Sequence, residues 1–156
     1  MKILLDTTYL LPAIGISIKG LPTDIPINLM AQGNEIYISQ ITLFELAAKG
    51  AKYINDGALT PEKVTRGIRA IAYNDEIQTI ATHESEILLT AFKLRKNLPD
   101  FIDCLILSSA ITNCDALATQ DADIHDLAEN AEFRNLLATE NPNFKIQALT
   151  SLRSPP

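Results

Sequence analysis

The chain has 156 residues, of which 47% are hydrophobic and 21% charged, and its 13 Lys and Arg against 19 Asp and Glu give a formal net charge of −6. These values exclude a disordered chain, and two cysteines exclude a disulfide-dense secreted scaffold. No apolar stretch approaches the ~20 residues of a membrane span, and Asp6 ends the N-terminal apolar run too early for a signal peptide. We therefore expect a cytoplasmic protein with no membrane partner. The acidic balance argues at first against a nucleic-acid partner.

Apolar runs alternate with helical patterns in the first half of the chain. Ile3–Leu5 is short and continuously apolar, which is typical of a strand buried on both faces. The stretch from Thr8 to about Ile18 predicts a helix, with Pro12 near its start, where a first turn tolerates proline. Further predictions are a short helix over Ile27–Gln32, a strand over Glu35–Ile38, a helix capped by Ser39 or Thr42 and running to about Ile54, and a helix from Thr60-Pro61 to about Ala72.

The second half continues this alternation. Glu76–Ile80 has the weak alternation of a strand, and apolar stripes predict helices from Glu84 to about Lys96 and from Phe101 to about Asn113. The remaining predictions are a strand over Asp115–Thr119, one or two short helices over Asp123–Leu137, and a last strand over Phe144–Leu149. We expect one α/β domain over residues 1–150 with a largely parallel sheet, followed by a tail over residues 151–156.

Four acidic residues stand at the ends of the predicted elements. Asp6 directly follows the first strand, and Asp121 follows another apolar strand by two residues. Asp103 falls in the first turn of one helix and Glu45 in the first turns of another. Because the ligand crevice of a parallel sheet lies beyond the carboxyl ends of its strands, the four carboxylates are expected to converge there.

Four neighbouring carboxylates repel one another, and a divalent cation removes that repulsion. Oxygen ligands with little nitrogen or sulfur favour Mg²⁺ or Mn²⁺. Such ions lower the pKa of a bound water and stabilise charge on the attacking and leaving oxygens of a phosphodiester. The acids therefore indicate metal-dependent phosphodiester hydrolysis.

Four segments resemble, in order, the motifs of the PIN-domain nucleases: Asp6–Leu11, Ile41–Leu46, Phe101–Ala110 and Leu117–Asp123. The interval of 18 residues from Asp103 to Asp121 matches the spacing usual in the family. The resemblance spans residues 1 to about 150. It implies a three-layer α/β/α sandwich and a metal-dependent endoribonuclease whose products carry 5′-phosphate and 3′-hydroxyl ends.

The resemblance also implies roles for individual residues. The catalytic and metal-binding quartet comprises Asp6, Glu45, Asp103 and Asp121, with Asp123 as a further metal ligand and Thr8 and Thr119 as supporting polar residues. Ile124 stands where members usually place an aromatic residue after the acid corresponding to Asp123. Many small prokaryotic members are VapC-like toxins, so the resemblance implies a toxin–antitoxin pair, a homodimer, and an antitoxin that blocks the acidic pocket, for example with an arginine.

Each acid also has a structural interpretation. Thr42 and Glu45 have the spacing of a capping box, and Asp100 with Asp103 could be a variant of one. Asp6 could cap the helix that follows it, and Asp121 and Asp123 could be turn residues. Only the four motifs together favour the metal site over these structural roles.

Basic residues provide candidate RNA contacts. Lys49 and Lys52 follow Glu45 by one and two helical turns, and three more basic residues recur along the next helix: Lys63, Arg66 and Arg69. A further basic group, Lys93, Arg95 and Lys96, ends another helix. These side chains either contact RNA phosphates or form solvated helix faces.

The histidines, the cysteines and two apolar segments are the remaining residues that could bind metal, act in catalysis or form an interface. His83 and His125 lie far from the motifs in sequence and have no zinc-like spacing, so we expect surface or capping roles. Cys104 and Cys114 are expected to be small buried side chains. The apolar segments Leu10-Leu11 and Leu43-Phe44 are candidates for the dimer interface.

Three other functions remain open. A phosphotransferase of the haloacid-dehalogenase type would use a strand-end Asp nucleophile with a second Asp two residues later, where this chain has Thr8. A PIN-like scaffold would bind RNA or protein without cleavage, although all four acids are present. The third possibility is an RNA-processing nuclease that is not a toxin.

Overall fold

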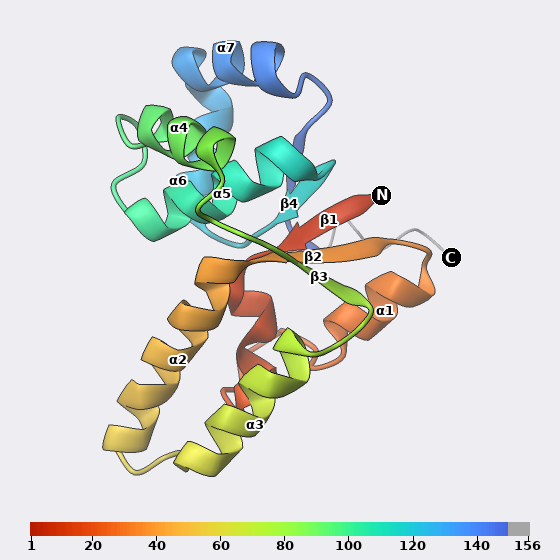
Figure 1. The fold of residues 1–156 in the computed structure, drawn as a ribbon, viewed down its shortest axis with the longest axis vertical. Helices are drawn as coiled ribbons and strands as arrows, with labels where there is room; N and C mark the ends of the chain where they lie inside the picture. The colour runs from red at the N-terminus through yellow and green to blue at the C-terminus, as the bar shows by residue number, and fades with distance from the viewer. Residues whose placement is uncertain (150–156) are drawn as a thin grey trace.

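The computed structural model describes residues 1–149, so the predicted tail over residues 151–156 lies outside the described residues. One five-stranded sheet runs through the molecule in the order β3-β2-β1-β4-β5, and every neighbouring pair of strands is parallel (Figure 1). The strands are β1 (Lys2–Leu5), β2 (Glu35–Ser39), β3 (Ile77–Ile80), β4 (Ala116–Ala118) and β5 (Lys145–Gln147).

Helical segments connect the strands. Before β3 the chain forms the 3₁₀ helix η1 (Thr7–Ile14) and the α-helices α1 (Ile25–Ala31), α2 (Gln40–Asn55) and α3 (Pro61–Ala72). After β3 it forms α4 (Ser85–Leu94), α5 (Phe101–Asn113), α6 (Ala122–Asp126), the 3₁₀ turn η2 (Leu127–Glu129) and α7 (Ala131–Glu140).

The sheet separates two apolar cores. Ile3 and Leu5 of β1 belong to a core with η1, α1 and α3, whereas Leu4 belongs to a second core with α4 and α5. This division follows from the two-residue period of a strand, which sends successive side chains to opposite faces. In Figure 1 the helices α4–α7 lie above the sheet and α1–α3 below it. The predicted three-layer α/β/α sandwich with a parallel sheet is confirmed.

Several boundaries differ from the prediction. The first helix is a 3₁₀ helix that ends at Ile14 rather than about Ile18, because Gly15 adopts a left-handed conformation with φ of 96°. Thr42 does not cap α2: the helix begins at Gln40, so Thr42 lies inside it, and the capping-box interpretation of Thr42 and Glu45 is wrong. The hydroxyl of Ser39, the residue before α2, lies 3.1 Å from the Ser109 hydroxyl rather than capping the helix.

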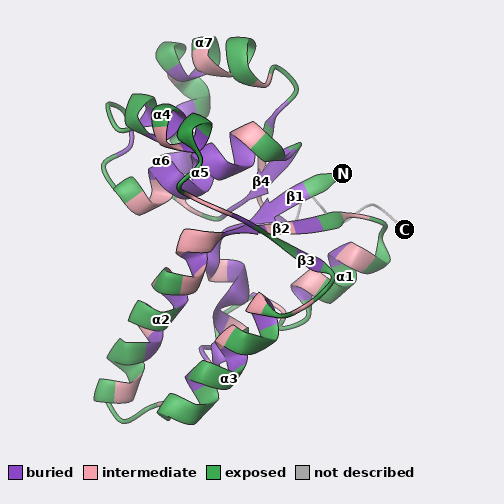
Figure 2. Cartoon of the chain, viewed as in Figure 1, coloured by how far each residue is buried: buried purple, intermediate pink, exposed green. Residues whose placement is uncertain are grey.

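Helices α2 and α3 form a hairpin that projects from the body of the molecule, which we call the arm (residues 46–73; Figure 1). Close packing at two glycines holds it. A Cβ on Gly50 would lie 2.5 Å from Val64 of α3, and one on Gly67 would lie 2.2 Å from the Ala13 carbonyl oxygen. The sides of the arm away from these contacts are largely exposed (Figure 2).

The arm carries a charge opposite to that of the whole chain. Residues 46–73 contain five basic and two acidic residues, a net charge of +3, so the rest of the chain carries −9. No helix within residues 1–149 is long and apolar enough to span a membrane.

Candidate active site

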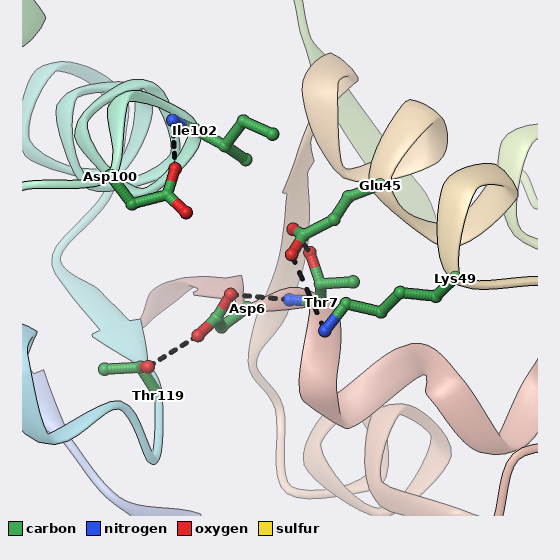
Figure 3. Close-up of polar contacts among 7 residues, drawn as sticks. All are labelled: Asp6, Thr7, Glu45, Lys49, Asp100, Ile102 and Thr119. Atoms are coloured by element: carbon green, nitrogen blue, oxygen red, sulfur yellow. Dashed lines mark hydrogen bonds and ion pairs between the residues drawn. The ribbon is translucent and has the colours of Figure 1, made fainter. Parts of the chain in front are cut away.

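Asp6 lies at the carboxyl end of β1, the central strand, and is 7% exposed. Its Oδ1 accepts the Thr7 N–H at 2.7 Å, and its Oδ2 accepts the Thr119 hydroxyl at 2.6 Å (Figure 3). Burial raises the pKa of Asp6 and the charges of Glu45 and Asp121 add to this, while the two hydrogen bonds act in the opposite direction. Asp6 therefore caps η1, as one structural interpretation held, and also faces other carboxylates.

Glu45 reaches the same region from α2, one residue before the arm begins. Its Oε2 accepts the hydroxyl of Thr7 at 2.5 Å, and its Oε1 lies 3.7 Å from Lys49 Nζ (Figure 3). Thr7 is 1% exposed and touches both Asp6 and Glu45, so it ties the first motif to the second. Sequence analysis missed Thr7, although its position directly after a strand-end acid could have drawn attention to it.

Asp103 faces the other acids from the first turn of α5. Burial raises its pKa from 3.8 to about 7, and the repulsion that adds to this comes from Asp100, Asp121, Asp6 and Glu45. Asp100 is the residue that caps α5, since its Oδ1 accepts the Ile102 N–H at 2.8 Å. The Asp103 carboxylate is therefore not the cap of this helix, and the other three quartet members contribute to its electrostatic environment.

Asp121 lies beyond β4 at the start of α6. Its Oδ1 accepts the Ile124 N–H at 3.0 Å, and its own N–H donates to the Thr119 hydroxyl oxygen at 3.0 Å. Thr119 is fully buried and therefore links Asp121 to Asp6 through a single hydroxyl group. Asp123 is exposed in the first turn of α6. The Thr8 hydroxyl makes no hydrogen bond to the quartet within residues 1–149.

His125 contacts this region, so the expectation that it lies far from the motifs is wrong: it follows Asp123 by only two residues. Its Nε2 lies 2.9 Å from the carbonyl oxygen of Thr119. The contact arises because α6 turns directly after Asp121 and brings position 125 back beneath the end of β4. The four-residue spacing from a helix cap could have indicated this return. His83 is exposed beside Glu84, as predicted.

The donor set of the quartet fits a hard divalent cation. Carboxylate and hydroxyl oxygens converge, and Lys49 is the one ion-pair partner of these acids within residues 1–149. In the same range no three or more His, Cys, Asp or Glu side chains stand close enough together to hold a metal ion by themselves. Mg²⁺ commonly uses only one or two carboxylates and keeps several waters, which this spacing permits. Asp6 and Asp103, whose pKa values are raised, are the acids that a cation would stabilise most.

The candidate RNA contacts lie on the arm. Lys49 and Lys52 are exposed or half-buried on α2, along the helix from Glu45. Arg66 and Arg69 line an open depression on α3, and the Arg69 guanidinium lies 5.3 Å from the centre of the Tyr73 ring.

Leu10 and Leu11 cannot form a dimer interface, because they are 2% and 5% exposed within the core. Phe44 remains exposed. An apolar surface that the sequence did not predict lies on α4 and α5, and we call it the aromatic patch: Leu89, Phe92 and Phe101, with the two phenylalanine ring centres 5.8 Å apart and stacked.

The cysteines are buried, as predicted. Burial raises the pKa of Cys104 to about 11 and that of Cys114 to about 12, so both are protonated thiols at neutral pH.

Comparison with known proteins identifies the family of this chain and a solved structure with a similar fold. Residues 3–130 match the PIN domain family. A chain in the crystal structure of VapBC2 from Rickettsia felis, bound to a DNA fragment from its promoter, is similar with a TM-score of 0.59 and 22% identity over 95% of this chain and 98% of that chain. Among curated proteins none matches. At this identity the likeness to VapBC2 shows the fold.

Proposed function

The chain belongs to the PIN-domain family, and from that premise we propose that it is a metal-dependent endoribonuclease that acts as the toxin of a toxin–antitoxin pair. The observation that carries the proposal is that two buried threonines join three acids from three segments: Thr7 contacts Asp6 and Glu45, and Thr119 contacts Asp6 and Asp121. Burial raises the pKa of Asp103, and repulsion from Asp100 and from these three acids adds to this. Such mutual repulsion destabilises the fold without a cation and favours the binding of one.

We propose Mg²⁺ or Mn²⁺ as the cofactor, with Asp6, Asp103 and Asp121 as its ligands, one or two of them directly and the others through water that the ion retains, and with Glu45 as a further ligand or as the acceptor for a water. The ion supplies a more acidic water and neutralises charge that develops on the phosphate. Thr7 and Thr119 orient the carboxylates that they contact. Asp123, which is exposed, is a further candidate ligand of the ion. Thr8 remains a candidate polar residue beside the ion.

RNA is the proposed substrate because the basic arm adjoins the acidic site. Lys49 and Lys52 extend from Glu45 along α2, with a rise of about 1.5 Å per residue, so they lie about 6 and 10 Å from it along the axis. Successive phosphates can bind along this stripe. Arg66 and Arg69 add charge on α3. Local positive charge on the arm thereby offsets the overall −6.

An antitoxin is the proposed protein partner. The VapBC2 chain that shares this fold comes from a toxin–antitoxin complex, and that supports the assignment for this chain. A cationic side chain of such a partner would pair with the carboxylates of the quartet and exclude metal. We place the complex in the cytoplasm, where RNA is available.

We also propose a homodimer that forms through the aromatic patch. Leu89 and Phe92 are 60% and 59% exposed on adjacent turns of α4. Glu86 lies three residues before Leu89 on α4, and Lys93, which also pairs with Glu140 Oε1 at 3.0 Å, lies four residues after Leu89. Antiparallel packing of two α4 helices would therefore place unlike charges opposite one another around an apolar centre.

The proposed activity is tested by incubating the full chain with RNA and either Mn²⁺ or a chelator. Cleavage should require the ion and should fall by at least about 100-fold in Asp6→Asn and in Asp103→Asn. RNA binding without cleavage under both conditions would favour the scaffold alternative. Expression that leaves growth unaffected despite cleavage in vitro would favour a processing nuclease that is not a toxin.

A further inference from the structure

His125 is not one of the four acidic residues, but hydrogen bonds through Thr119 connect it to two of them, Asp6 and Asp121. We propose that His125 is a positioning residue that, through Thr119, holds Asp6 and Asp121 in the arrangement that binds the metal. The inference rests on the proposed metal-dependent function, which assigns the metal to these two acids.

Every polar group of Thr119 has a partner. Its N–H donates to the Gln147 carbonyl at 3.0 Å, which ties it to β5. Its hydroxyl donates to Asp6 Oδ2 at 2.6 Å and accepts the Asp121 N–H at 3.0 Å. Its carbonyl oxygen lies 2.9 Å from His125 Nε2. Thr119 is therefore the junction between two quartet acids, and His125 provides its fourth contact.

The segment from Thr119 to His125 closes on itself. Asp121 caps α6 through the Ile124 N–H, and the His125 N–H donates to the Asp121 carbonyl at 3.1 Å. The imidazole ring then returns to Thr119, where the chain left the sheet. Rotation of the peptide unit between Thr119 and Gln120 would break the ring contact, and because this unit leads directly to Asp121, it would also move the N–H that the Thr119 hydroxyl accepts.

The hydrogen-bond partner of His125 determines that its Nε2 atom carries a proton. A carbonyl oxygen only accepts hydrogen bonds, so Nε2 carries the hydrogen and donates it. Thr119 is fully buried, and β4 ends one residue before it, so no strand ladder supplies another donor to its carbonyl. Within residues 1–149, loss of the imidazole therefore leaves this buried acceptor without a protein partner, and the segment must shift or admit water.

The test uses the full chain and Mn²⁺ as the probe. His125→Leu keeps most of the side-chain volume without a donor, His125→Ala removes both, and His125→Gln retains an N–H donor of similar reach. His83→Ala is the matched control, because His83 is exposed beside Glu84. We expect the Mn²⁺ dissociation constant to rise about tenfold in the first two variants and to stay within about threefold in the other two.

A second readout does not depend on metal. The Asp121 amide, which donates to the Thr119 hydroxyl, should exchange its hydrogen faster in His125→Leu and His125→Ala than in the wild type or His125→Gln. Unchanged Mn²⁺ affinity with unchanged exchange, or a glutamine variant no better than leucine, overturns the proposal. If the wild type binds no Mn²⁺, the proposed function fails, and the exchange measurement alone decides whether His125 positions this segment.

Discussion

The hydroxyl of Thr7 donates to Glu45 Oε2 at 2.5 Å, across 38 residues of sequence. This contact joins the end of the central strand to the base of the arm. The Thr7 N–H also binds Asp6, so one residue constrains two members of the quartet.

Thr7→Val tests this constraint, because valine keeps the shape of threonine and removes its hydroxyl. Glu45 then loses its buried donor and can turn toward Lys49 or solvent. We expect the cleavage rate and the Mn²⁺ affinity to fall about 10-fold to 100-fold. Thr7→Ser, which retains a hydroxyl, should keep most of both. Equal activity in the valine and serine variants would contradict the role of this contact.

The stability of the metal-free chain should depend on pH through Asp103. Its pKa is 3.8 in the unfolded reference and about 7 in the fold, so the folded state retains the proton more tightly. The stabilisation is fully present below 3.8 and is lost as the pH rises through about 7. In chelator, the melting temperature should therefore be higher at about pH 5.5 than at about pH 7.5.

Asp103→Asn should reduce this pH dependence, whereas Asp126→Asn, an exposed acid on α6, should leave it unchanged. Mn²⁺ should raise the melting temperature of the wild type most at the higher pH. A melting temperature that increases steadily from the lower to the higher pH in chelator would contradict the raised pKa.

The arm should contribute to RNA affinity through counterion release. Binding is measured in the Asp6→Asn background, so that the RNA stays intact. Each of Lys49→Ala and Lys52→Ala should reduce the slope of log affinity against log salt by about 0.7. Lys145→Ala is the control, because Lys145 is exposed at the start of β5, at the opposite edge of the sheet. Unchanged slopes in both arm variants would exclude these phosphate contacts.

The aromatic patch should control the oligomeric state. Leu89→Glu and Phe92→Glu place a charge in the apolar centre and should convert the dimer to a monomer in light scattering after size exclusion. Ile27→Glu, at a residue on α1 that is 68% exposed, should leave the dimer intact. A wild type that stays monomeric at concentrations well above about 10 μM would contradict the proposed interface.

Most of the fold was predictable because its signals are local. The buried strands are short apolar runs, and Thr60 caps α3 through the Lys63 N–H, as its sequence indicates. The boundaries were less accurate where one residue ends an element, as Gly15 does after η1.

The candidate site residues that directly follow strands could be predicted from the sequence. The contacts that depend on how the chain folds back were missed. Asp6 and Asp121 could be placed from strand ends alone. The contact of Thr7 with Glu45 joins residues 38 positions apart, which no periodicity reveals. The contact of His125 with Thr119 depends on the turn of α6 after its Asp121 cap. The burial of Leu10 and Leu11 likewise depends on how the chain folds back, because η1 packs both residues into the core.

The chemical ends of the RNA products test the account most directly. If water attacks the phosphorus at a metal site formed by the quartet, cleavage with Mn²⁺ leaves 5′-phosphate and 3′-hydroxyl ends, and Asp103→Asn removes these products. Attack by the RNA's own 2′-hydroxyl would instead leave 2′,3′-cyclic phosphates without any need for metal. Products with 3′-hydroxyl ends that disappear in chelator are the predicted result. Cyclic phosphates, or cleavage unchanged in Asp103→Asn, would contradict it.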